Sequence, residues 1–520
     1  MRSPICAAVV LSTLVVSTPD LVAQKGTPEP RLGISFNPPK GWVELPADCD
    51  RHATVRLFSA PRALAGRDST HTPLLRVMFF AKGGDASKDV VDNLPRATPF
   101  RSLEDFAQRG LGAKEVAKQA EKVGGVEGQR VTGKAVPGER IVIGQTFPLE
   151  DGEAAVCVEL LTVQADKLKK EIDAALGSLA AIPRTSVPRL DPPWVTDADW
   201  AKKDAATRRA AHRKWAEEFV AQTAKVLEAG YKLQKSKYWT VLSATDAGYT
   251  KKATAAAEVA REWLAKKLPE LTKEAPLPAV LRIFDSMDQY NAFVTTRNDS
   301  REYSARSREL HCVNDRDNGG PTGFGMVLRA VLWQVFDDTD PGVLPALPRW
   351  LDNGCWEFLR SSHFDGKKLE FAQGDVEKGR IEYYRQKNQA MPALWDLMQE
   401  HIQPSPTDGT VEAVWGYTPE CSRLMRWFWQ YDGLKAFDKP GLLVDYVRAL
   451  GTAYGKLGPD PTADVATVGL TEAQQKDANG RRYKWRDAML VETNNLAIPL
   501  QVEVWKAINE KWLKWNADFR

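Results

Sequence analysis

The sequence lacks a large net charge of either sign and, beyond its first residues, lacks any long hydrophobic run. Its 520 residues include 71 basic and 68 acidic side chains, which gives a formal net charge of +3. Proteins that bind nucleic acids carry a surplus of basic side chains, so this balance predicts no nucleic-acid partner. No segment after the N-terminus approaches the roughly 18 consecutive apolar residues of a spanning helix, so we expect no membrane span.

Histidine and cysteine are both scarce and scattered. The six histidines are His52, His71, His212, His311, His363 and His401. A zinc-binding helix needs two imidazoles four residues apart, which places both on one face, and no two of these histidines are closer than 19 residues. No two cysteines have C-x-x-C spacing either, which disfavours a cysteine-rich zinc site. We therefore predict neither a metal nor another cofactor.

The first 23 residues are typical of a signal peptide. Arg2 precedes an apolar stretch from Ile5 to Val16, and Ala23 offers a small residue for cleavage. We therefore expect an extracytoplasmic protein, either periplasmic or secreted. Removal of the signal leaves Cys49, Cys157, Cys312, Cys355 and Cys421. Export permits disulfides, but the sequence does not specify which of these residues pair, and the odd count leaves at least one unpaired.

Residues 28–182 predict an α+β domain. Strand patterns recur at 54–58, 74–80, 128–134, 139–148 and 153–161, and helical patterns at 103–122 and 166–179. The segment opens with Phe36-Asn37-Pro38-Pro39-Lys40-Gly41-Trp42, which indicates two strands around a turn. With this opening, its late strand pair and its closing helix, the segment resembles the PsbP/Mog1-like fold. That resemblance implies a sheet covered by helices, and a binding module more often than a catalytic one.

A proline-rich segment at 183–198 predicts a stiff linker between two domains, because it holds Pro183, Pro188, Pro192 and Pro193. The second domain spans residues 199–520. Strand and helix patterns alternate up to about residue 360, which predicts a lobe with a small sheet. The remainder is mainly helical, so the predicted fold class is α+β in both domains.

Two neighbouring segments of the second domain carry a recognisable pattern. A helix is expected at Thr322–Phe336, and Pro348–Leu359 reads PRWLDNGCWEFL. From about residue 238 onward the chain resembles the gluzincin peptidases of the peptidase MA-like group. In that group the helix carries HExxH and the second segment reads P-x-W-L-x-E-G-x-x-E-[YF]. The matching residues are Gln334, Pro348, Trp350, Leu351, Gly354, Glu357 and Phe358.

The chain departs from the gluzincin pattern at every position that carries the zinc chemistry. The first histidine corresponds to Arg329, the catalytic glutamate to Ala330, the second histidine to Trp333 and the third ligand to Asn353. Arginine has no lone pair to give, alanine and tryptophan cannot bind zinc, and asparagine is a poor ligand for it. The resemblance therefore implies a peptidase scaffold without peptidase chemistry, in an exported protein that binds a peptide or protein.

The replaced positions suggest what stands in the metal's place. Arg329 and Trp333 are four residues apart and share a helical face, so we expect the guanidinium to lie over the indole. We also expect Arg329 to substitute a fixed positive charge for zinc and to pair with Glu357 or Asp352. The alternative is that Arg329 points to solvent and Trp333 is an ordinary core residue. Further cleft-lining or structural candidates are Gln334, Trp350 and Cys355.

Two other functional classes stay open. The chain is an active hydrolase if Cys355 is a nucleophile with His363 as its base, or if His311 and His363 join carboxylates in an unrecognised metal site. It is a purely structural envelope component if no cleft is left.

Overall fold

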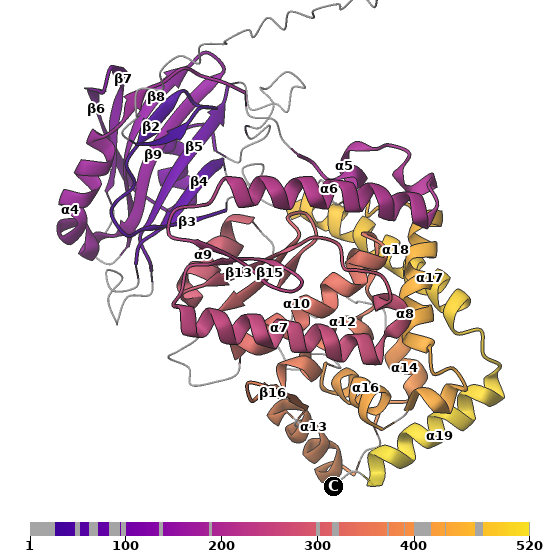
Figure 1. Cartoon of the computed structure of the whole chain (residues 1–520). Helices are drawn as coiled ribbons and strands as arrows, with labels where there is room; N and C mark the ends of the chain where they lie inside the picture. The colour runs from indigo at the N-terminus through magenta and orange to yellow at the C-terminus, as the bar shows by residue number, and fades with distance from the viewer. Residues whose placement is uncertain are drawn as a thin grey trace, which may run out of the picture.

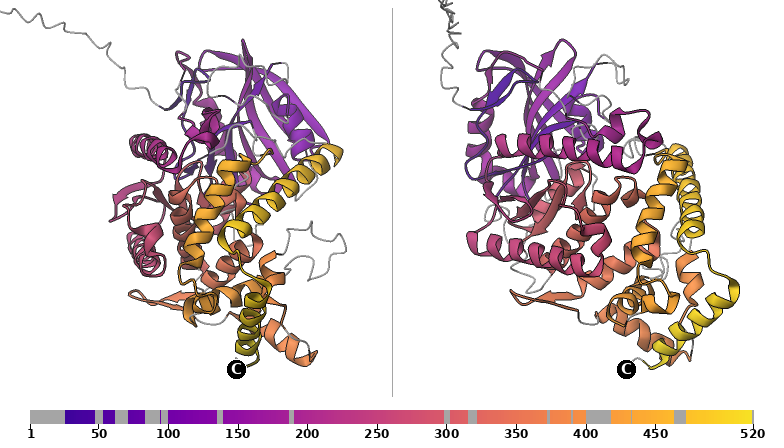
Figure 2. Two further views of the ribbon diagram at one scale, coloured as in Figure 1. Left: turned by 90° about the vertical axis from the view of Figure 1, so that its right-hand side faces the viewer. Right: turned by 45° about the vertical axis from the view of Figure 1, so that its right-hand side comes forward.

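The structure is a computed structural model. It describes residues 26–46, 53–61, 71–82, 94, 100–134, 139–186, 190–297, 302–314, 322–371, 374–388, 391–399, 418–431, 433–462 and 472–518. The predicted signal peptide, Cys49, His52 and His401 lie outside these ranges. Within them, no helix is long and apolar enough to cross a membrane. The chain forms an α+β fold in which an N-terminal module lies beside a larger, mainly helical one (Figures 1 and 2).

The N-terminal module is built on a seven-stranded antiparallel sheet in the order β3-β4-β5-β9-β8-β7-β6. Its strands are β3 (Val43–Leu45), β4 (Thr54–Ser59), β5 (Leu74–Ala81), β6 (Glu115–Val123), β7 (Val126–Lys134), β8 (Arg140–Leu149) and β9 (Gly152–Leu161). A smaller sheet joins β1 (Thr27–Glu29), β2 (Ile34–Phe36) and β10 (Ala180–Ala181). The large sheet is covered on both faces, which explains why β9 is buried along most of its length.

One face of the large sheet packs against helix α4 (Thr162–Gly177), which contributes Leu168, Ile172 and Leu176 to the core. The other face is covered by the short helix α3 (Leu103–Asp105) and the π-helical turn η1 (Phe106–Gly110).

The predicted helix over 103–122 is wrong. Only its start is helical, and Glu115–Val123 forms strand β6 instead. Gly124 and Gly125 have φ of 57° and 84°, which is the conformation of a two-residue hairpin turn and returns the chain as β7. The nine cross-strand pairs that this turn allows override the helical propensity of the Ala-, Glu- and Lys-rich segment.

The second module begins in the linker. Its first part contains α5 (Pro193–Thr196), η2 (Trp200–Lys202), α6 (Ala205–Lys225), β11 (Lys232–Lys235), β12 (Thr240–Ser243), α7 (Ala247–Lys267), α8 (Pro269–Thr272), β13 (Val280–Phe284), α9 (Met287–Arg297), β14 (Tyr303–Ser304), β15 (Glu309–Val313), α10 (Thr322–Thr339), α11 (Val343–Ala346) and α12 (Arg349–Arg360). The sheet order is β11-β12-β13-β15-β14, with parallel pairing inside and an antiparallel strand at each edge.

The rest of the second module is mainly helical, as the sequence predicts. It contains β16 (Ser362–Phe364), β17 (Leu369–Phe371), α13 (Asp375–Gln386), α14 (Leu394–Gln399), α16 (Thr418–Gln430), η3 (Gly433–Phe437), α17 (Leu442–Leu457), α18 (Glu472–Ala497) and α19 (Val502–Asp518). These helices surround α10 and α12 and share one continuous apolar core with them. In Figure 1 they form the orange and yellow side of the molecule.

The five-stranded sheet is buried on both faces, and its two faces have different partners. Val241, Leu281 and Cys312 point into the core shared with α7 and α10. Phe284 and Val313 point the other way, into a separate core. That second core also contains Val43, Leu45, Leu57 and Leu74 of the N-terminal module, with Val220, Tyr290 and Phe293. The two modules are therefore joined by a shared apolar core, and not only by the chain between them.

A tight turn at Gly230 completes the contact between the modules. Glu44 of β3 donates its backbone N–H to the Ala229 carbonyl, and its carboxylate accepts from the Ala229 N–H. Gly230 has φ of 89°, and a Cβ there would lie 3.0 Å from a methyl group of Val43. Only glycine fits this turn without backbone strain and a steric contact.

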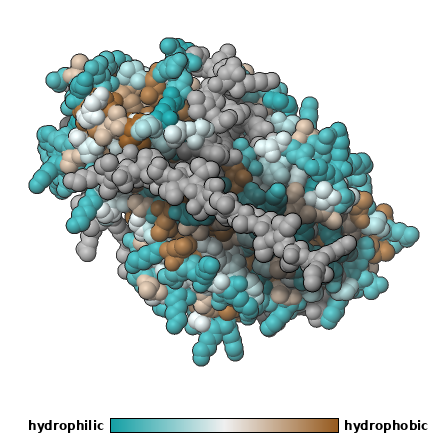
Figure 3. Space-filling model, turned by 45° about the horizontal axis from the view of Figure 1, so that its top comes forward, coloured by the Kyte–Doolittle hydropathy of each residue, from teal (hydrophilic) through white to brown (hydrophobic). Residues whose placement is uncertain are grey.

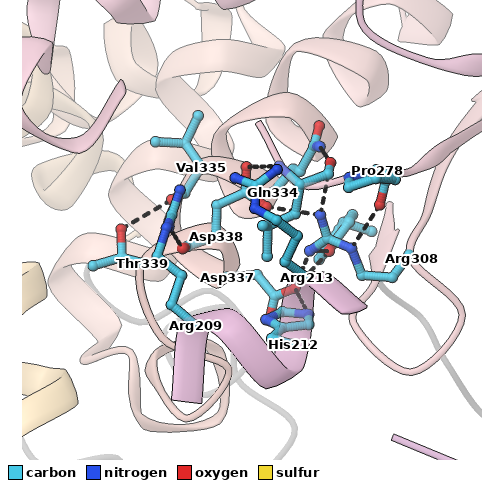
Figure 4. A network of polar contacts seen from close by, with 12 residues as sticks. Arg209, His212, Arg213, Pro278, Arg308, Gln334, Val335, Asp337, Asp338 and Thr339 are labelled. Carbon is cyan, nitrogen blue, oxygen red and sulfur yellow. Dashed lines mark hydrogen bonds and ion pairs between the residues drawn. The ribbon is translucent and has the colours of Figure 1, made fainter. Parts of the chain in front are cut away.

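Helix α6 is anchored to the C-terminal end of α10 by buried polar groups (Figure 4). Arg308 donates to Asp337 at 2.5 Å and to Asp338 at 2.7 Å, and the Tyr303 hydroxyl donates to Asp337 at 2.6 Å. From α6, His212 places its Nε2 3.8 Å from Asp337 Oδ2. Also from α6, Arg208 pairs with Asp340 at 2.5 Å, and Arg209 donates to the Asp338 carbonyl. These paired buried groups fix the position of α6 along α10.

Substituting Gly230 by alanine tests the inter-module turn. We expect Gly230→Ala to lower the free energy of unfolding by about 1–2 kcal/mol, the cost of a left-handed backbone for a residue with a Cβ. Gly177→Ala is the control, since a Cβ there meets no atom within 4 Å. It should be neutral, or stabilising by up to about 1 kcal/mol. Urea unfolding measures both, and equal effects would contradict the strain at Gly230.

The burial of His212 predicts that the protein loses stability as the pH falls. Burial, with Arg308, Arg209 and Arg213 nearby, lowers the pKa of His212 well below its usual value, so it is neutral in the folded chain. The unfolded chain takes up that proton near pH 6.5, so stability from this group is present above about pH 6.5 and falls as the pH drops toward the folded pKa. At pH 5 we expect a loss of about 2 kcal/mol.

The loss from His212 is isolated by comparison with His212→Phe, which keeps a ring against Trp194 and removes the titration. Unfolding free energies from pH 7.5 to 5 should fall more steeply for the natural protein. Parallel pH profiles would show that His212 is not held neutral.

Candidate functional site

The candidate site lies where α10 meets α12, beside the edge strand β14. Helix α10 packs on β15 and α7 and also contacts β14 and α12. Helix α12 begins after Pro348, whose carbonyl accepts from the backbone N–H groups of Leu351 and Asp352. The segments that resemble the two zinc-binding segments of gluzincins are thus adjacent helices.

Arg329 is buried between these elements, and its side chain is only 6% exposed. Its guanidinium forms an ion pair with Glu302, directly before β14, whose side chain is 11% exposed. The expectation of a solvent-facing Arg329 is therefore wrong, and the expectation of an acidic partner is met by a different residue. Glu357, one of the two predicted partners, forms its ion pair with Arg360 at 3.0 Å.

The indole beneath the Arg329 guanidinium belongs to Trp356 on α12, at 5.0 Å from the ring centroid. Arg360 covers the same indole at 4.8 Å, so two guanidinium groups contact one ring. The sequence pointed instead to Trp333, which shares the helical face of Arg329. A cation and an indole attract in either arrangement. Trp356 is nearer to the guanidinium because α12 packs across α10 at this turn.

Trp333 and Ala330 are both core residues. Trp333 is 2% exposed and its ring lies 5.8 Å from that of Phe336, and Ala330 is fully buried. The interpretation of Trp333 as an ordinary core aromatic describes it best. On α12, Asn353 is partly buried and donates from its side-chain amide to the Thr418 hydroxyl at 3.3 Å. Asp352 is also partly buried.

The residues that match the gluzincin pattern have structural contacts. Gln334 accepts from the Trp239 indole N–H at 2.7 Å and donates to the Leu277 carbonyl at 3.2 Å. Trp350 is 1% exposed and packs edge-on against Tyr446. A Cβ on Gly354 would lie 2.6 Å from the carbonyl oxygen of Cys421, so glycine lets α16 approach α12. Packing therefore accounts for these matches without any chemistry.

Cys355 has the surroundings of a structural cysteine. It is fully buried, and burial raises the pKa of its thiol well above the usual value. His363, its suggested base, is exposed on β16. A reactive cysteine needs a thiolate and access to substrate, and these surroundings disfavour both. The structure describes four cysteines, and none of them forms a disulfide: Cys157, Cys312, Cys355 and Cys421.

The described part of the chain contains no group of three or more histidine, cysteine, aspartate or glutamate side chains arranged to hold a metal ion. His311 is fully buried in aromatic surroundings, with Phe293 4.8 Å from its ring, and it lies near Glu309. His212 belongs to the network between α6 and α10. His363 lies apart from both, on the hairpin that follows α12.

Sequence reasoning missed the two contacts that define this site. Glu302 lies before a two-residue strand that has no sequence signal of its own, and Trp356 was not among the predicted site residues. The spacing of Asn353 and Trp356 does carry information, because residues three apart share a helical face. A search of that face for partners of Arg329 would have found the indole.

Removing the Arg329 charge tests whether the pair is buried. In Arg329→Met, Glu302 keeps its charge without its guanidinium partner, so we expect a loss of about 3–5 kcal/mol in unfolding free energy. The double variant Arg329→Met, Glu302→Gln should regain most of it. Chemical denaturation of the four proteins of this cycle gives the coupling. A loss below about 1 kcal/mol in the single variant would show that the pair behaves as a surface ion pair.

Comparison with known proteins found neither a protein family whose pattern matches the chain nor a curated protein of matching sequence. Among solved structures, the chain is similar to the solution structure of cyanobacterial PsbP from Synechocystis sp. PCC 6803, with 13% identity and a TM-score of 0.19. That likeness covers 30% of this chain and 90% of the other. A crystal structure from Bacteroides thetaiotaomicron VPI-5482 is similar at 9% identity and a TM-score of 0.19, covering 59% and 76%. At these scores neither likeness carries an argument about function.

Proposed function

We propose that this is an exported, non-catalytic protein that retains a metallopeptidase-like scaffold and binds a peptide or protein. The observation that carries the proposal is the buried Arg329–Glu302 pair, whose guanidinium lies over the Trp356 indole. By the gluzincin resemblance, Arg329 stands where the first zinc-binding histidine would be. The guanidinium has no lone pair to bind a metal ion, and Glu302 already balances its charge. This place therefore offers a divalent cation neither a ligand nor a net negative charge.

The order of elements around the site also supports the proposal. An antiparallel edge strand, β14, lies beside α10, and α12 packs against α10. In a peptidase of this kind, an extended peptide would lie along such a strand. Two side chains of α12 are still accessible at this place, because Trp356 is partly exposed and the Arg360 side chain is 40% exposed. We propose these two as the contact points for a ligand.

The active-hydrolase alternative has less support. Its cysteine version requires a thiolate at Cys355, whose pKa is raised by burial. Its metal version requires donors that converge, and His311 and His363 lie on different elements, one buried and one exposed.

Zinc content and hydrolysis test the proposal together. Purified without chelators, the natural protein should hold no stoichiometric zinc by elemental analysis and cleave no peptide in a casein-derived pool. One zinc per chain, or cleavage abolished by a chelator, would overturn the non-catalytic proposal.

A variant that restores the four positions tests the alignment itself. Arg329→His, Ala330→Glu, Trp333→His and Asn353→Glu together should bind about one zinc ion per chain, as three protein ligands suffice for a catalytic site. Because Trp333 is a core residue, its replacement puts the fold at risk. Circular dichroism therefore has to show that the variant is folded. The same variant with Asn353 retained is the control and should bind zinc more weakly. A folded variant that binds no zinc would count against the alignment.

A further inference from the structure

Strand β6 is a long, regular and exposed sheet edge. It is the last strand of the seven-stranded sheet and pairs with β7 over nine residues without a register shift. All its residues are exposed except Val116 and Val123, which are partly buried. No other strand of the described chain pairs with its outer side. In Figure 1, β6 and β7 lie at the outer margin of the module. Such an edge is a template for a further strand.

The hairpin turn determines which backbone groups of β6 face outward. Val123 and Val126 flank a two-residue turn, so they form a hydrogen-bonded pair, and alternate residues back along β6 do the same. The intervening residues direct their N–H and C=O groups away from β7. These residues are Val116, Lys118, Ala120 and Lys122.

We propose that β6 pairs antiparallel with β6 of a second copy of this chain, with Gln119 opposite Gln119 on a twofold axis. This register places outward-facing residues opposite one another, because Lys118 faces Ala120 and Val116 faces Lys122. Each of these is a hydrogen-bonded pair. The two seven-stranded sheets then become one continuous sheet.

Charge selects this register over its neighbours. With Gln119 at the centre, Ala117 faces Glu121 and no two like charges are directly opposite. Centring on Lys118 would place that lysine opposite itself, and centring on Ala120 would place Lys118 opposite Lys122. Like charges directly opposite each other destabilise a strand pair. Lysines on an edge normally discourage pairing, but here Lys118 and Lys122 oppose uncharged residues.

The rest of the molecule leaves room for a second copy. The larger module packs against β3 and β4, at the opposite end of the seven-stranded sheet. Six strand spacings separate β3 from β6, which is roughly 29 Å. Among the coloured residues, the face shown in Figure 3 is mainly hydrophilic, with hydrophobic residues in small groups. On β6 itself most of the exposed side chains are polar: Glu115, Lys118, Gln119, Glu121 and Lys122. Pairing through backbone groups suits such a surface better than an apolar interface, and a single strand pair predicts a weak, concentration-dependent dimer.

Two substitutions at the exposed residue Ala117 should change the stability of the dimer in opposite directions. Ala117→Glu places a glutamate opposite Glu121 twice in the dimer, and Ala117→Lys places a lysine there instead. The opposed side chains lie close together because this pair is not hydrogen-bonded. We expect the dissociation constant of the dimer to rise roughly 3- to 10-fold with glutamate and to fall roughly 3- to 10-fold with lysine.

Sedimentation velocity over a concentration series of the purified protein measures the effect. Ala120→Pro is a third variant, which removes an outward-facing N–H and should leave a monomer. Thermal unfolding establishes that each variant keeps the fold. A monomer at all concentrations of the natural protein would overturn the proposal, as would glutamate and lysine variants that shift the equilibrium equally or not at all. Dimers that persist in Ala120→Pro would place the interface elsewhere.

Discussion

Burial of both faces of the five-stranded sheet is the constraint on which the rest of this structure depends. One face of the sheet holds α10 against α7, and this fixes the turn of α10 that carries Arg329. The opposite face is covered by α6 and α9 together with the N-terminal module, because Val220, Tyr290 and Phe293 share one core with Val43, Leu45, Leu57 and Leu74. A parallel sheet cannot leave either face to water, so the two modules depend on each other. The N-terminal module is thereby oriented with β6 at its far edge.

The same constraint explains why the charged groups of the candidate site are buried and pair with each other. Arg329 points into a layer of packed helices, where an isolated guanidinium would be costly, and Glu302 and Trp356 provide the partners that make its burial tolerable. Elsewhere on the same helices, Gln334 hydrogen-bonds the Trp239 indole, and Gly354 lets α16 approach α12.

The sequence predicts the elements with strong periodicity and fails where tertiary contacts decide. The strands at β5, β8 and β9 and the helix α10 follow from their apolar patterns, and so does the mainly helical character of the C-terminal part. The segment at β6 is rich in helix-forming residues, yet a hairpin turn and its partner strand make it extended. Glu302 was missed because nothing local indicates that a loop residue meets a helix 27 positions later. An acidic partner for Arg329 was predicted as one of two alternatives, but as Glu357 or Asp352, because the partner of a buried charge can lie far away in sequence.

The central claim is that a buried arginine occupies the place of the metal. Anomalous diffraction at the zinc absorption edge, from crystals of the natural protein soaked in zinc, tests it most directly. The account predicts no anomalous peak between α10 and α12, and electron density for Arg329 in contact with Glu302. A zinc peak at that place, with Arg329 displaced from Glu302, would contradict it.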